Sequence, residues 1–274
     1  MKKSLYFFSA MLLSSVSFYS CESDDQSAKT NEIPTETVAK IASLGFDVND
    51  KAPMRYEQGY LVEGDIYLTD ADLATMSEPV AIPNAEQYRT TNLVKGTPRN
   101  IKVYIPTSSF SSTYVAALDE AIRRYNAEGL TLTFSRITTS TGANIIYKRL
   151  SRSDERRGVL GSAGFPTSAG NPYSQIAMSG ILESTYGLSV NGIATIMAHE
   201  MGHCIGFRHT DYFNRAISCG GSASNEGDGG VGAIHIPGTP TGATASAKSF
   251  MLACTDGSNR PFNTDDKTAL NALY

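Results

Sequence analysis

The sequence predicts an α+β fold, and three observations lead to this prediction. Strand and helix patterns follow one another irregularly over residues 99–149, a second helix with an apolar face lies near residue 190, and the chain after residue 210 has little periodicity. The chain has 274 residues, of which 41% are hydrophobic, enough to bury a sizeable core. Its 23 basic and 27 acidic residues give a formal net charge of −4 without a basic cluster, so we expect no nucleic-acid partner.

The N-terminal residues are typical of an export signal. Residues 1–20 hold two lysines and then an apolar stretch, Leu5–Tyr19, which is shorter than the roughly 20 apolar residues of a membrane-spanning helix. Cys21 follows a small residue and precedes acidic ones, a pattern similar to a bacterial lipobox. We therefore expect a lipid anchor on Cys21 as the membrane contact, with ordinary cleavage nearby as the alternative. The protein is expected to be extracytoplasmic, either an outer-membrane or cell-surface lipoprotein or a secreted protein.

Two segments precede the main domain. Residues 21–40 are polar with few apolar anchors, which favours a flexible tether. Residues 41–98 form a small unit with a strand-like stretch, Tyr60–Leu68, around Gly64. A short helix, Asp70–Met76, is expected to follow, opened by an Asp cap.

Residues 99–274 are expected to form the main domain. The stretch 151–173 contains four glycines, two prolines and a charge run, so we expect a long surface loop with a solvated charged face. A final helix, capped by Thr264 or Asp265, closes the chain. The other expected elements are a strand at Ile101–Ile105, a helix capped by Ser112 or Thr113 that stops at Gly129, strands at Leu130–Ile137, Asn144–Arg149 and Ser174–Met178, and a helix capped by Ser189 or Asn191.

The cysteines fit an oxidising compartment. Apart from Cys21, the chain has Cys204, Cys219 and Cys254, enough for one disulfide and one thiol, and the count alone leaves the pairing open. We favour Cys219 with Cys254, because both lie in loop-like, glycine-flanked sequence, whereas Cys204 has the setting of a buried helical residue.

A cluster of histidines carries the chemistry. His199 and His203 are four residues apart on a predicted helix, so their directions differ by about 40° and both side chains project toward one point. Gly206 can adopt the left-handed conformation that ends a helix, which lets His209 approach from another direction as a third nitrogen ligand. Three imidazoles suit Zn²⁺ and leave a position open for water, and Glu200 can take the proton of that water.

The alternative is that these are ordinary structural histidines. The chain has only four histidines, and three of them occupy the three positions of this pattern, which argues against that alternative. The fourth, His235, is isolated in the sequence, and we do not expect it to bind metal.

The segment His199–Asp211, HEMGHCIGFRHTD, is similar to the zinc signature HExxHxxGxxHTD of metzincin metallopeptidases, and in particular it resembles the bacterial dual-action HEIGH metallopeptidases. Ser249–Met251 is similar to the family's Met-turn, whose methionine underlies the zinc. The resemblance covers residues 99–274 and departs from the astacin-like pattern at Ala253, where those enzymes have a tyrosine ligand. Further matches in metzincin order are Ala121–Asn126, Leu132–Phe134, Asn144–Ile146 and Gly161–Pro166.

The resemblance implies a metzincin-like catalytic domain: a twisted mixed sheet with two long helices and an irregular C-terminal subdomain, preceded by a small propeptide-like unit. It also implies a cleft along an edge strand, Ser174–Met178, where an extended peptide or protein substrate pairs by strand addition.

We therefore expect a secreted or surface-anchored zinc endopeptidase in which His199, His203 and His209 hold Zn²⁺ and Glu200 is the general base. The alternative is a zinc-stabilised surface binding module on the same scaffold without turnover. Glu200 distinguishes the two hypotheses, because a purely structural zinc site needs no base beside its first ligand. The sequence sets no oligomeric state.

A regulatory contact is expected in the N-terminal unit. The residues Val62–Ile66 resemble the FEGD motif of astacin propeptides, which implies that Asp65 is a latent zinc ligand that occupies the open position. The alternative is an ordinary turn, since Glu-Gly-Asp between apolar stretches is common turn chemistry.

Overall fold

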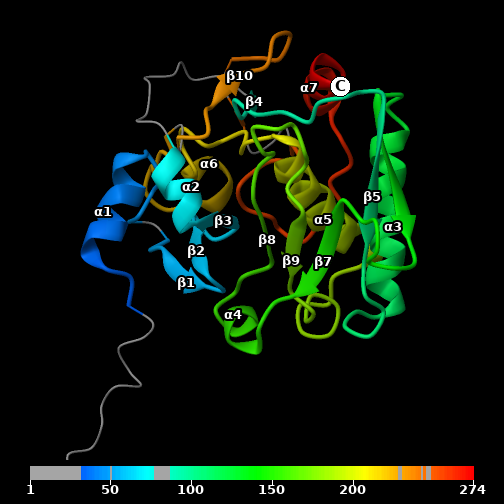
Figure 1. Ribbon diagram of the computed structural model, residues 1–274, viewed down its shortest axis with the longest axis horizontal. Coiled ribbons are helices and arrows are strands. Elements are labelled where there is room, and N and C mark those ends of the chain that lie inside the picture. Colours follow the sequence, from blue (N-terminus) through cyan, green and yellow to red (C-terminus); the bar gives the residue numbers. More distant parts are fainter. Residues whose placement is uncertain (1–31, 50, 77–86, 228–229, 242, 245–247) are drawn as a thin grey trace, which may run out of the picture. The chain divides into compact units, whose positions relative to one another are not determined.

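The architecture is built on an eight-stranded mixed sheet with the strand order β1-β2-β3-β8-β9-β7-β5-β6 (Figure 1). The computed structural model describes residues 32–49, 51–76, 87–227, 230–241, 243–244 and 248–274. The strands of the large sheet are β1 (Met54–Tyr56), β2 (Gly59–Val62), β3 (Ile66–Thr69), β5 (Arg99–Tyr104), β6 (Leu132–Ile137), β7 (Ile145–Arg149), β8 (Gly161–Ala163) and β9 (Gln175–Met178), and a small second sheet pairs β4 (Tyr88–Arg89) with β10 (Ile234–His235).

The helices confirm the predicted α+β class, with two long ones beside the sheet. Helices α3 and α5 pack against each other, and Figure 1 shows α3 at the β5 end of the sheet, away from β1. The helices are α1 (Thr35–Ser43), α2 (Asp70–Thr75), α3 (Ser112–Asn126), α4 (Arg152–Arg156), α5 (Val190–Ile205), α6 (Ala216–Cys219) and α7 (Thr264–Leu273).

The core forms where the sheet meets these two helices. Strand β5 buries Ile101 and Val103 and exposes Lys102 between them, as its alternating sequence predicts. Its neighbours β6 and β7 both run parallel to it, and β9 runs parallel to β7. On the helical side, the Tyr125 hydroxyl of α3 donates to the carbonyl of Ala198 on α5 at 2.7 Å, which fixes the helix that carries the histidine motif.

The prediction that Ser174–Met178 is an edge strand is wrong. Strand β8 pairs antiparallel with β9, and β3 pairs with β8 in the parallel direction through Ile66 and Ala163. Strand β9 therefore lies inside the sheet. The expected loop 151–173 contains β8, which consists of the three small residues Gly161–Ala163. One of its partner strands, β3, is far away in the sequence, so no local pattern predicts this pairing.

The charge run at the start of that expected loop is a solvated face only in part. It forms α4, in which Arg152 and Arg156 are exposed as predicted, whereas the acidic side chains Asp154 and Glu155 are buried. Glu155 pairs with Arg149 at 3.0 Å, and Asp154 pairs with Arg157. Neutralisation by neighbouring arginines is what allows two carboxylates to be buried here.

The helix caps are partly as predicted. For α3 the prediction is wrong, because Ser111 is the cap and Ser112 is already the first helical residue. Ser189 caps α5, one of the two candidates, and its side chain accepts from the Gly192 amide. The predicted Asp70 cap of α2 is wrong, because Thr69 fills that position. The predicted caps of α7 are wrong as well, since Asn263 is the cap. In both cases an aspartate three residues later completes a capping box, which satisfies two backbone amides at once and selects the earlier residue.

Helical structure is present before the predicted end of the tether at residue 40. Helix α1 starts at Thr35 and buries Ile41, so residues 35–40 are helical rather than part of a flexible linker. Residues 33–274 form one compact unit that includes the predicted segments 41–98 and 99–274. The predicted export signal and Cys21 lie outside the described residues. None of the helices in the described part of the chain has the length and apolar character to cross a membrane.

The disulfide prediction is confirmed. Cys219 at the end of α6 is bonded to Cys254, and Cys204 is a buried free thiol in α5. The bond ties the chain just beyond the histidine motif to the segment that follows Met251, so both sides of the site are fastened to each other.

Candidate metal centre

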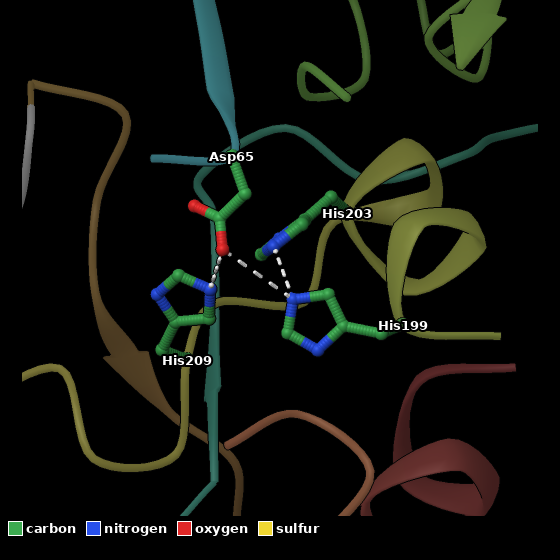
Figure 2. Close-up of side chains that lie close together, drawn as sticks. All are labelled: Asp65, His199, His203 and His209. Atoms are coloured by element: carbon green, nitrogen blue, oxygen red, sulfur yellow. Dashed lines mark hydrogen bonds and ion pairs between the residues drawn. The ribbon is translucent and has the colours of Figure 1, made fainter. Parts of the chain in front are cut away.

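The three histidines of the motif meet at one point. His199 and His203 project from the same face of α5, and their Nε2 atoms lie 3.0 Å apart. Helix α5 ends at Gly206, whose φ of 110° places it in the left-handed region. The chain turns there and brings His209 to the same point, as Figure 2 shows. All three side chains are buried.

Each histidine is oriented by a partner on its other ring nitrogen. The Nδ1 of His199 lies 2.8 Å from the carbonyl of Phe250, and the Nδ1 of His203 lies 2.9 Å from the carbonyl of Phe207. A carbonyl oxygen only accepts, so both Nδ1 atoms donate and both Nε2 atoms present lone pairs. Two lone pairs that face each other at 3.0 Å repel unless a cation lies against them. The donor set therefore fits a metal ion.

Asp65 reaches the same point from the N-terminal unit. It follows the tight turn between β2 and β3, in which Glu63 and Gly64 both have positive φ. Its Oδ2 lies 3.2 Å from His209 Nε2 and 3.8 Å from His199 Nε2 (Figure 2). Asp65, His199, His203 and His209 each offer a ligand atom within 4.8 Å of the others. The structure thus brings the predicted latent ligand and the three predicted histidines together.

Glu200 lies at the edge of this cluster. Its side chain is buried, and its Oε2 has no hydrogen-bond partner. It rests against β8, where a Cβ added to Gly161 would come within 2.4 Å of Glu200 Oε1. A cavity of about 130 Å³ lies beside it, lined among others by Asp65, His199 and Ile196. An unpartnered carboxylate oxygen next to a cavity is free to take a proton from a molecule bound there.

The electrostatics of the cluster favour a cation. Burial, and then the charge of His209, lowers the pKa of His199 to about 4, and burial also lowers the pKa of His203, so both rings are neutral and able to bind metal. Burial also lowers the pKa of His209, but the carboxylates of Glu226 and Asp65 outweigh it and raise the value to about 10. Burial, and then the charge of Asp65, raises the pKa of Glu200. The carboxylate of Asp65, which faces the three Nε2 atoms, favours a divalent ion at this point.

The methionine predicted for the Met-turn lies under the helix. Met251 is fully buried, and a Cβ added to Gly202, between the two helical histidines, would come within 2.6 Å of its Sδ. The Met251 carbonyl accepts from the Thr210 amide at 2.9 Å, next to His209. The turn is held in place by Asp266 of α7, which accepts from the Phe250 amide at 3.2 Å.

Two further residues complete the comparison of the site with the sequence prediction: His235, which was expected to lie outside it, and Glu226, which was not predicted. His235 is on β10, hydrogen-bonded to Thr239 and in edge-to-face contact with Tyr88, so it is not part of the cluster. Glu226, which the sequence analysis missed, lies 2.7 Å from His209 Nδ1. A signal was available in hindsight: Glu226 is the single glutamate in the glycine- and serine-rich stretch 220–249.

Comparisons with known proteins identify a family. The family model of the dual-action HEIGH metallo-peptidases matches residues 60–274, a region that includes the hairpin with Asp65 as well as the histidines. No curated protein matches the chain. Two solved structures of myroilysin match: one is 14% identical, covers 68% of this chain and 98% of its own with a TM-score of 0.42, and the other is 15% identical, covers 73% and 99% and has a TM-score of 0.40.

Proposed function

Because the chain belongs to the dual-action HEIGH metallo-peptidase family and is a zinc metallopeptidase, we propose that it cleaves internal peptide bonds at the cluster of His199, His203 and His209. The observation that carries the proposal is the convergence of three imidazole Nε2 atoms beside the unpartnered carboxylate of Glu200. The three histidines are the protein ligands of the zinc.

Zinc held there supplies Lewis-acid chemistry: it polarises the scissile carbonyl and makes a nearby water more acidic. Glu200 takes the proton of the attacking water and delivers it to the nitrogen of the leaving amine. The buried surroundings of Glu200 raise its pKa, which makes it a stronger base than an exposed glutamate. The backbone of β8 can pair with an extended substrate, because β8 rather than β9 borders the hairpin beside the site.

We propose that the structure represents the latent state of the enzyme. Asp65 Oδ2 lies against His199 and His209, where a substrate carbonyl or the attacking water would have to be. The carbonyl of Asp65 also accepts from the Ala163 amide at 2.9 Å, so the hairpin uses the edge of β8 that a substrate needs. Asp65 therefore occupies both the position beside the histidines and the edge of β8, which supports the prediction of a propeptide-like unit.

Replacement of Glu200 by alanine tests the catalytic part of this proposal. Glu200→Ala removes the base but no ligand, so zinc stoichiometry and the thermal unfolding curve should stay as in the wild type. Peptide cleavage should fall by about 100-fold or more. The measurement is the initial rate on a broad peptide library in the Asp65→Asn background, where latency does not mask the rate, with zinc content determined in the same sample. Cleavage at the rate of Asp65→Asn alone would exclude Glu200 as the base.

Asp65→Asn tests latency. Asparagine has nearly the same shape but is a weaker zinc ligand, so the full chain should gain peptidase activity on a short peptide that needs little of β8. Asp70→Asn is the matched control, because Asp70 lies in the same unit and accepts from the Tyr60 hydroxyl at 2.6 Å instead of facing the histidines. Equal activity of the wild type and both variants would mean that the hairpin is a structural element and does not inhibit the zinc site.

We also propose that the enzyme acts outside the cytoplasm, anchored through Cys21 or secreted. The disulfide Cys219–Cys254 supports this compartment, because cytosolic thiols are kept reduced. Mass spectrometry of the mature N-terminus decides between the two forms: a diacylated Cys21 identifies a lipoprotein, and an unmodified N-terminus identifies a secreted protein. A chain that retains residues 1–20 would contradict export.

A further inference from the structure

We propose that Glu226 is a positioning residue of the zinc site: its carboxylate holds the imidazole of His209 so that Nε2 faces the metal. The inference rests on the proposed function, in which His209 is a zinc ligand. Nothing in the histidine motif predicts it, since Glu226 lies 17 residues beyond His209 in a stretch without periodicity.

The hydrogen bond itself fixes the tautomer. Glu226 Oε1 lies 2.7 Å from His209 Nδ1, and both side chains are fully buried. An ionised carboxylate only accepts, so Nδ1 is a donor; once zinc replaces the proton on Nε2, the lone pair of Nε2 is directed at the ion beside Asp65, His199 and His203. The other two histidines rely on backbone carbonyls. Of the three rings, that of His209 alone has a charged partner on Nδ1, which makes it a more basic ligand.

Glu226 is itself fastened by two arginines. Arg215 Nη1 donates to Oε1, and Arg208 Nη2 lies 3.5 Å from Oε2, with both guanidinium groups buried. Glu63, Glu226 and His209 are also close enough to offer a cation site. The two arginines already balance the two glutamates, so we assign this group a structural and orienting role and no second metal.

The same arrangement connects His209 to the N-terminal unit. Arg215 Nη2 donates to the carbonyl of Glu63 at 3.1 Å, two residues before Asp65 in the same hairpin. The loop that carries Glu226 also contacts this unit, because Ser224 donates to Asp47. The arginine that holds Glu226 in place therefore also holds the hairpin that delivers Asp65.

The test compares zinc affinity in three variants of the full chain, Glu226→Gln, Glu155→Gln and His209→Ala, by competition with a chromophoric chelator. Glu226→Gln keeps the shape of the side chain and removes its charge, so we expect 10- to 100-fold weaker zinc binding and a changed visible spectrum of the cobalt-substituted protein. Glu155→Gln is the matched control: that carboxylate is also buried and paired with an arginine, but its partner is Arg149 and no histidine. It should bind zinc as the wild type does.

A measurement on the wild type covers the case in which Glu226→Gln does not fold. In the zinc-loaded protein, NMR should show a slowly exchanging, downfield proton on His209 Nδ1, bonded to a carboxylate. Zinc affinity of Glu226→Gln within twofold of the wild type, or a His209 ring without a proton on Nδ1, would overturn the inference. Unchanged zinc binding in His209→Ala would instead overturn the proposed ligand set, so the two failures are distinguishable.

Discussion

The packing of Met251 beneath helix α5 gives a quantitative prediction. A Cβ added to Gly202 would lie 2.6 Å from Met251 Sδ, 3.1 Å from Phe250 Cε2 and 3.4 Å from Tyr125 Oη. The sulfur is therefore the severe obstacle, and the other two contacts need only small adjustments. Gly202→Ala and Met251→Ala should consequently be coupled, because the methyl group of the first variant enters space that the second one vacates.

The magnitudes follow from this geometry. Met251 is fully buried, so Met251→Ala should lower the free energy of unfolding by about 2 to 5 kcal/mol. Gly202→Ala gains about 1 kcal/mol of helix propensity and loses about 1 to 3 kcal/mol to overpacking. In the double variant the overpacking against sulfur disappears, so its loss should be smaller than the sum of the single losses by about 1 to 3 kcal/mol.

Thermal unfolding of the wild type, the two single variants and the double variant at saturating zinc measures this coupling. The melting temperature should change by roughly 2 to 4 °C per kcal/mol for a unit of this size. Gly192→Ala combined with Met251→Ala is the matched control. Gly192 is also in α5, but a Cβ there would meet the Gly257 carbonyl at 2.5 Å instead of the methionine. That pair should be additive. Additivity within about 0.5 kcal/mol for Gly202 and Met251 would refute the packing argument.

Two further predictions concern metal and pH. Zinc at about 1,000 times its dissociation constant should add roughly 4 kcal/mol to the free energy of unfolding, so removing it with a chelator should lower the melting temperature by about 8 to 16 °C. An unchanged melting temperature would mean that zinc does not bind the folded state preferentially. Hydrogen bonds from Arg123 and Arg124 lower the pKa of Glu120 to about 2. Glu120→Gln should thus cost about 1 kcal/mol above pH 4.5, and the difference from the wild type should vanish as the pH falls toward 2, because protonation of Glu120 then removes the same interaction; a constant difference across this range would contradict it.

Several features could be predicted from the sequence because they depend on neighbours along the chain. The spacing of His199 and His203 on a helix sets their common direction, and Gly206 in the left-handed conformation sets the turn toward His209. The glycine-flanked setting of Cys219 and Cys254 was enough to favour the observed disulfide. Each of these inferences needs only local periodicity or local backbone conformation.

Other local inferences failed where two signals competed within a few residues. Asp70 and Thr264 are acceptable caps in isolation, but Thr69 and Asn263 precede aspartates at the spacing of a capping box, and the reciprocal hydrogen bonds decide the boundary.

Only the tertiary structure determines which segments far apart in the chain come into contact. Strand β8 has three residues and no sequence pattern of its own, so its place between β3 and β9 depends on both partners. Asp65 reaches His209 across 144 positions, and Glu226 reaches it from a glycine-rich stretch that has no periodicity. The cluster of three histidines follows from one short motif. The positions of Asp65 and Glu226 beside it follow from which backbones the fold brings together, because burial and charge pairing act through space and leave no period in the sequence.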